Sequence, residues 1–107
     1  MTELGFHVLL ALGNSKAHGY AIGKDVQERS GGRLDPTTGA LYQVLKRMTD
    51  EGLIQPASPP PGEGVDPRRK YFQLTRAGRE AAAAEIERLE GLVATGRQRR
   101  LHRARPR

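Results

Sequence analysis

Residues 34–54 read LDPTTGALYQVLKRMTDEGLI, and this stretch decides the fold that the sequence predicts. Its apolar residues recur every three or four positions, which predicts one amphipathic helix over residues 36–51. The apolar stripe of this helix consists of Leu41, Val44, Leu45 and Met48. We expect Asp35 to cap the helix, Pro36 to take its first position and Gly52 to end it.

The face opposite the stripe carries side chains suited to contact with a nucleic acid. It presents a small residue, a phenol, an amide and an ammonium, from Gly39, Tyr42, Gln43 and Lys46. These groups permit close approach, phosphate contact and hydrogen bonding to base edges. The alternative is an ordinary amphipathic helix with a solvated polar side, because helical periodicity alone is common.

Size and composition exclude several classes of protein. A chain of 107 residues suggests one domain with a modest core, for which self-association is a natural supplement. It has no cysteine, and its three histidines are far apart in sequence, so no metal or other cofactor is expected. No apolar run is long enough to span a membrane and no secretory signal is visible, so we expect a cytoplasmic protein.

The net charge of +6 comes from the C-terminal segment and not from the body of the chain. Residues 97–107 contain six arginines and no acidic residue, whereas residues 1–96 contain twelve basic and twelve acidic residues. Like-charge runs of this kind are usually disordered and often serve as interaction arms. We therefore expect a disordered basic tail that either attracts phosphate weakly or only raises solubility.

Two further helices and two strands complete the expected domain. The apolar pattern predicts helices over 2–13 and 20–30, and three helices with glycine-rich breaks fit a helix-turn-helix unit. Strands are predicted at 53–55 and 70–74, around a loop over 56–67 that holds five prolines and two glycines. A helix-turn-helix followed by such a hairpin is a winged helix, whose loop is the wing.

The last predicted helix is too long for so small a body to cover. Thr75 is a good N-cap, four alanines at 81–84 favour the helix, and it extends to about Ala94, roughly 30 Å. Its first half is expected to pack on the first helix, and its second half to meet a second copy of the chain. The expected dimer interface comprises Leu4, Val8, Ala82, Ile86, Leu89 and Val93.

The predicted fold is mainly α with a small β-hairpin: a winged helix-turn-helix followed by one long C-terminal dimerisation helix. We divide the chain into a DNA-binding domain over 1–74, a dimerisation helix over 75–96 and the basic tail over 97–107. Two reading helices related by a two-fold axis would meet a palindromic site on double-stranded DNA. The candidate DNA contacts are Lys16, Tyr20, Thr37, Thr38, Gly39, Tyr42, Gln43, Lys46, Arg68, Arg69 and Lys70.

Several of these side chains have structural alternatives. Tyr42 can be half-buried against the second helix while its hydroxyl stays wet. Lys46 or Arg47 can pair with Asp50, which lies one turn further along the same helix. His18 is expected to be a turn residue bonded to the backbone rather than a ligand or a base.

Short motifs spread over about residues 4–80 resemble the PadR family of bacterial transcriptional regulators. They are Ala17-His18-Gly19-Tyr20, Gly39-Ala40-Leu41-Tyr42 with Leu45, Arg47 and Glu51-Gly52-Leu53-Ile54, Arg69-Lys70-Tyr71-Phe72-Gln73-Leu74-Thr75, and Ala77-Gly78-Arg79. The resemblance, closest to short members with one C-terminal helix, implies a homodimer whose third helix enters the major groove and whose wing contacts the backbone. It also implies a repressor that releases DNA when a small-molecule effector binds, in some short members at the dimer interface.

The chain departs from the family pattern at the start of the reading helix. Family members usually have Ser/Thr-Pro-Gly-Thr before Leu-Tyr, whereas here Thr37 and Thr38 fill the first two places and Ala40 replaces the last threonine. One candidate hydroxyl contact is thereby lost. The chain also has no tryptophan, so the stacking of aromatic drugs on indole, known in some short members, is not expected.

Two rival interpretations remain open. An enzyme needs paired titratable groups or an activated nucleophile in a pocket, and the sequence offers no cysteine and no glycine-rich phosphate loop. We therefore expect that the chain is not an enzyme. A winged helix used for contact with a protein or an RNA would leave Gln43 and Lys46 as a solvated face.

Overall fold

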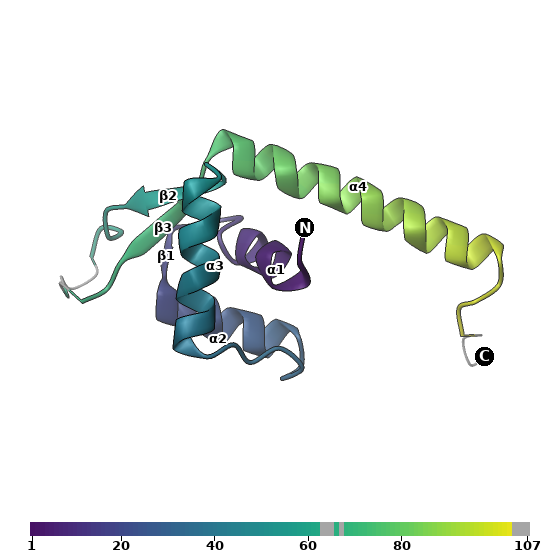
Figure 1. Ribbon diagram of the computed structural model, residues 1–107, viewed down its shortest axis with the longest axis horizontal. Coiled ribbons are helices and arrows are strands. Elements are labelled where there is room, and N and C mark those ends of the chain that lie inside the picture. The colour runs from purple at the N-terminus through teal and green to yellow at the C-terminus, as the bar shows by residue number, and fades with distance from the viewer. Residues whose placement is uncertain (63–65, 67, 104–107) are drawn as a thin grey trace.

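The computed structural model describes residues 1–62, 66 and 68–103 of the chain (Figure 1). These residues form four helices and a three-stranded antiparallel sheet. In chain order the elements are α1 (Glu3–Ala11), β1 (Ala17–His18), α2 (Gly19–Arg29), α3 (Thr38–Asp50), β2 (Ile54–Ala57), β3 (Tyr71–Leu74) and α4 (Arg76–Gln98). Figure 1 shows α1, α2 and α3 gathered with the sheet into one body, from which α4 extends as a long arm.

The hydrophobic core lies between the three helices of the body and is closed on one side by the sheet. The predicted stripe of α3 is confirmed, because Leu41, Leu45 and Met48 are buried and Val44 packs partly against the same cluster. The other buried members come from α1, α2, β2 and β3, and they are Val8, Leu9, Leu12, Ile22, Val26, Ile54 and Phe72. The described chain therefore has the winged-helix fold that the sequence predicted.

Each described helix begins at a side chain that accepts a hydrogen bond from a backbone N–H of its first turn. For α3 this corrects the expected cap. Thr37 Oγ1 accepts a hydrogen bond from the Ala40 N–H at 3.1 Å, so the helix begins two residues later than predicted, and Asp35 and Pro36 precede it. The cap must lie about three residues before the N–H that it satisfies, and Thr37 fills that position.

The predicted hairpin is present as β2 and β3, and a third strand joins it. β1 pairs with β3 in a segment that was expected to be a turn, with Ala17 opposite Phe72 and His18 opposite Tyr71. A strand of two residues is too short to leave an alternating pattern in the sequence. β2 also continues through Pro56, because it lies at the edge of the sheet, where a missing N–H is tolerated.

Helix α4 is longer than predicted and ends inside the expected tail. It continues through Gln98, and carbonyls of its last turn accept hydrogen bonds from the N–H groups of Arg100 and Leu101. Arg100 adopts a φ of 59°, the left-handed conformation that closes many helices. The expectation of disorder is therefore wrong for residues 97–101, which end a helix, while residues 104–107 lie outside the described part of the chain.

Glu85 on α4 is a charged residue that the described structure buries, with only 8% of its surface exposed. Arg88 donates two hydrogen bonds to its carboxylate, from Nε at 2.6 Å and from Nη2 at 2.9 Å. These bonds lower the pKa of the Glu85 carboxyl below its ordinary value of 4.5, although burial acts in the opposite direction. The stability that this carboxyl contributes is present above pH 4.5 and is lost as the pH falls through the folded-state pKa.

We therefore expect Glu85→Gln to reduce the loss of unfolding free energy on acidification, because the variant has no carboxyl to protonate at this position. The measurement is urea unfolding at a series of pH values from about pH 7 into the acid range, over which the carboxyl passes from charged to protonated. Glu87→Gln, at an exposed neighbouring position, is the control and should lose as much stability as the parent chain. An unchanged acid response in Glu85→Gln would contradict the assignment.

Candidate nucleic-acid interface

The polar face of α3 lies on the surface of the body. Gln43 and Lys46 are exposed, and Tyr42 keeps 39% of its surface exposed. The face is free because the large aliphatic side chains of α3 and Met48 pack toward the core on the other side of the helix. Lys46 Nζ lies 3.0 Å from Asp50 Oδ2 in an exposed ion pair, which was the structural alternative to a DNA contact.

Tyr42 connects the exposed face of α3 to the start of α2. A Cβ atom placed on Gly19 would lie 2.8 Å from the Tyr42 hydroxyl oxygen, so the end of the phenol ring rests directly over Gly19. A side chain at position 19 would displace the end of the Tyr42 ring. Tyr42 is therefore partly covered by α2, as the alternative interpretation held.

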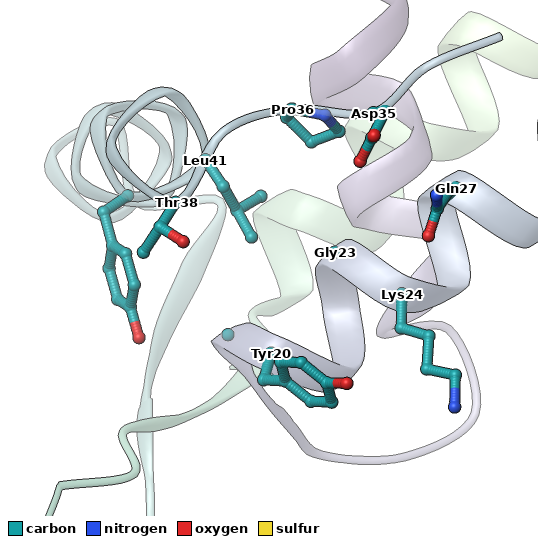
Figure 2. A pocket seen from close by; sticks show the side chains of 10 residues that line it. Tyr20, Gly23, Lys24, Gln27, Asp35, Pro36, Thr38 and Leu41 are labelled. Atoms are coloured by element: carbon teal, nitrogen blue, oxygen red, sulfur yellow. The ribbon is translucent and has the colours of Figure 1, made fainter. Parts of the chain in front are cut away.

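A groove of about 320 Å³ separates α2 from the first turn of α3. Figure 2 shows Tyr20 and Lys24 rising from α2 along one side, Thr38 and Leu41 on α3, and Asp35 with Pro36 in the connecting segment. The groove thus brings together three candidate DNA contacts that are far apart in the sequence: Tyr20, Thr38 and Tyr42. Tyr20 is 75% exposed, so its phenol is available to a ligand in this groove.

Lys24 is a member of this groove that the sequence interpretation missed. It lies four residues after Tyr20 in α2, so both side chains occupy the same face of the helix. That spacing was the signal that could have identified it. Lys24 adds a cation to a surface whose other polar side chains are hydroxyls, the Gln27 amide and the Asp35 carboxylate, and its ammonium can contact a phosphate.

The basic end of the wing joins the same side of the molecule through the sheet. Lys70 precedes Tyr71, whose partner His18 in β1 directly precedes α2. The His18 ring packs edge-on against Tyr71 at 5.3 Å between centroids, and its Nδ1 accepts a hydrogen bond from the Ala21 N–H at 3.2 Å. His18 is therefore a helix cap bonded to the backbone, and the pairing holds the wing beside the N-terminus of α2.

The remaining candidates do not line the groove. Arg68, Arg69 and Lys70 are exposed at the end of the wing, and Lys16 is exposed just before β1. Arg68 and Arg69 both lie against Asp66, at 3.3 and 4.0 Å between their Nε atoms and its carboxylate. Thr37 and Gly39 are exposed at the start of α3, although the Thr37 hydroxyl already serves as the cap.

The residues expected at a dimer interface fall into two groups. Val8 is fully buried in the core of its own chain, so its assignment to the interface is wrong: α1 uses this position to pack on α2 and α3. Leu4 and Ala82 are partly buried against the same core. The second group lies further along α4, where Ile86 and Val93 are 41% and 55% exposed and Leu89 is half-buried.

Leu92 belongs with this second group and was missed. It is 57% exposed, more than either Ile86 or Val93, and it follows Leu89 by three residues on α4. The sequence interpretation followed a spacing of three and four residues that ends on Val93 and passes over Leu92. The exposed apolar surface of α4 is therefore wider than predicted.

Two further features bear on the kind of site. Within residues 1–62, 66 and 68–103, no three histidine or acidic side chains are grouped as a metal ion would require. Over the same ranges, no helix combines the length and the apolar character needed to cross a membrane.

A three-helix body, an exposed polar face on its third helix and a basic wing define a winged helix-turn-helix protein of the DNA-binding class. The sequence profile of the transcriptional regulator PadR-like family matches residues 8–84, and the chain belongs to this family. The family is one of transcriptional regulators.

Individual proteins and solved structures also resemble the chain. An uncharacterised 37.1 kDa protein of transposon Tn4556 from Streptomyces fradiae is 38% identical over 89 residues, which cover 80% of this chain. The chain spans about a quarter of that relative, 24% of its length. A PadR family transcription regulator from Clostridium difficile R20291 superposes with a TM-score of 0.75 at 24% identity, covering 91% of this chain and 97% of the other.

A third relative was solved with a nucleic acid. Bacillus subtilis PadR in complex with operator DNA is 25% identical and superposes with a TM-score of 0.65, over 79% of this chain and 47% of that chain. The smaller share of the Bacillus subtilis chain reflects its greater length.

Proposed function

We propose that this protein is a sequence-specific transcriptional regulator that binds a palindromic operator as a homodimer. Residues 1–74 bind DNA, and α4 makes the dimer. The observation that carries the proposal is the exposed face of α3, whose amide and ammonium groups stand opposite a stripe in which Leu41, Leu45 and Met48 are buried. Such a helix can enter a major groove without losing any core contact.

Each part of the surface has a distinct role in this proposal. Gln43 has the amide geometry to pair with adenine, and Lys46 can contact guanine or a phosphate. Tyr20, Lys24 and Thr38 face a groove beside α3 in which the sugar–phosphate backbone would lie, and the wing cations would hold the backbone on the other side. These contacts position α3, and the α3 side chains read the sequence.

The proposal also covers regulation. We infer that the protein represses the genes beside its operator and that a small molecule bound at the dimer interface releases it, a behaviour that the resemblance to the PadR family supports. Because the chain has no tryptophan, such an effector would be held by aliphatic side chains and not by indole stacking. We expect the protein to act in the cytoplasm, as its resemblance to bacterial regulators implies.

Lys46→Ala is expected to weaken operator binding by about 1–3 kcal/mol, or roughly 5- to 150-fold, because one base-edge or phosphate contact is lost in each half-site. The measurement is a fluorescence anisotropy titration of the full chain with duplexes tiled along the DNA beside its gene. Arg76→Ala is the matched control, since Arg76 is an exposed cation on α4 outside the proposed surface. Equal affinities for Lys46→Ala and the parent chain would remove α3 from the interface.

A further inference from the structure

Three of the cations proposed to face DNA lie against carboxylates of the protein's own surface: Lys46, Arg68 and Arg69. On α3, the Lys46 ammonium lies 3.0 Å from Asp50, and both side chains are exposed, at 79% and 64%. Asp50 follows Lys46 by one turn, so an anion stands on the same face as the proposed groove contact. A helix that enters a major groove with this face therefore brings a negative charge toward the phosphates.

The same arrangement recurs at the wing. Asp66 Oδ1 accepts a hydrogen bond from the Arg68 backbone N–H at 2.9 Å and faces the Arg68 Nε at 3.3 Å. Its other oxygen lies 4.0 Å from the Arg69 Nε. The hydrogen bonds from Arg68 hold the pKa of the Asp66 carboxyl below its ordinary value of 3.8, so it is ionised at neutral pH.

These ion pairs contribute little to stability, because exposed pairs are screened by water and salt. Their effect on DNA binding is larger. Attraction to phosphate supplies nearly all of the affinity for DNA of arbitrary sequence, and each cation that leaves a carboxylate for a phosphate gains less than a free cation would. A correct base sequence adds contacts that compensate for this loss, and an incorrect sequence does not.

We propose that Asp50 and Asp66 are specificity-determining residues, which hold Lys46 and the wing arginines in ion pairs and thereby weaken binding to non-operator DNA more than binding to the operator. The inference rests on the proposed function, because it requires that α3 and the wing face DNA. It assigns a role in sequence discrimination to two residues that make no favourable contact with DNA themselves.

The test uses the full chain and two duplexes of equal length and composition, one carrying the operator and one scrambled. Asp50→Asn and Asp66→Asn remove one charge each while keeping side-chain shape, and asparagine at 66 can still accept the bond from the Arg68 N–H. We expect each variant to bind the scrambled duplex about 3- to 8-fold more tightly at 0.1 M salt, as gaining about one phosphate contact would. Binding to the operator should tighten less than 2-fold, so the specificity ratio falls.

Two control variants separate this effect from a change in net charge. Glu51→Gln releases Arg47 from an ion pair that has the same i, i+4 spacing as the pair of Lys46 with Asp50. Arg47 and Glu51 each follow Lys46 and Asp50 by one residue, so their pair lies on a different side of the helix, beside the start of α1. Glu80→Gln releases Arg76 on α4. Both controls should leave the affinity for the scrambled duplex within 2-fold of the parent chain.

The outcomes separate a failure of this inference from a failure of the proposed function. If the parent chain prefers the operator and the two asparagine variants discriminate as well as it does, only the inference is overturned. The same holds if Glu51→Gln and Glu80→Gln tighten binding to the scrambled duplex as strongly as the asparagine variants. If the parent chain binds no duplex in preference to the scrambled one, the proposed function fails and the inference fails with it.

Discussion

Leu92→Asp is expected to convert the protein to monomers and to weaken its binding to a two-half-site operator by at least about 100-fold, because avidity between linked sites contributes 10²–10⁴. Leu92 is 57% exposed on α4, next to Val93 in the sequence and three residues after Leu89, and the body of its own chain does not cover it. A carboxylate at this position costs the folded monomer little, but at a dimer interface it would be buried without a partner.

Sedimentation velocity at micromolar concentration measures the first effect and a DNA titration measures the second. Leu101→Asp makes the same chemical change at an apolar residue that is 78% exposed beyond the end of α4, and it should leave both quantities unchanged. A dimer that survives Leu92→Asp would show that α4 does not make the interface. Monomers that bind the operator at full affinity would show that the interface is not needed.

Gly78→Ala is expected to destabilise the fold by about 3 kcal/mol, the upper end of the usual cost of overpacking. A Cβ atom at Gly78 would lie 2.0 Å from the carbonyl oxygen of Leu53 and 3.0 Å from its carbonyl carbon. Both atoms belong to backbone that is fixed at its neighbours, since Thr75 donates hydrogen bonds to the carbonyls of Gly52 and Leu53. Neither side can yield without moving α4 away from the sheet.

Thermal and urea unfolding measure this effect, with a fall in Tm of roughly 10–20 °C expected for a chain of this size. Gly91→Ala is the matched control, because it lies in the same helix and its added methyl would meet no atom within 4 Å. The control should stabilise α4 by up to about 1 kcal/mol through helix propensity alone. A Gly78→Ala variant as stable as Gly91→Ala would contradict the close packing of α4 on Leu53.

The elements that the sequence predicted well are those that bury a regular apolar pattern. The stripe of α3 was predictable because Leu41, Leu45 and Met48 repeat at helical spacing and all pack into the same hydrophobic cluster. The ends of the helices were less predictable, because Asp35, Pro36 and Thr37 are all good first-turn residues and only the geometry of the connecting segment selects Thr37. β1 was missed because its two residues gain their strand conformation from pairing with β3.

The surfaces were harder to predict than the core. Val8 and Val93 occupy similar positions in their apolar patterns, but one is enclosed by its own chain and the other projects from an arm, and only the packing separates the two cases. The groove between α2 and α3 depends on the approach of Tyr42 to Gly19, which joins residues of different helices. Lys24 is recognised as a candidate because it lines that groove, which the sequence alone does not show.

The central claim is that two copies of α3 read one palindromic sequence, and selection of bound duplexes from a random pool tests it most directly. The full chain is incubated with the pool, and bound DNA is amplified and sequenced over several rounds. The account predicts one enriched motif with dyad symmetry, whose half-sites are centred about one helical turn apart. An enriched motif without symmetry, or a pool that stays random after repeated rounds, would contradict it.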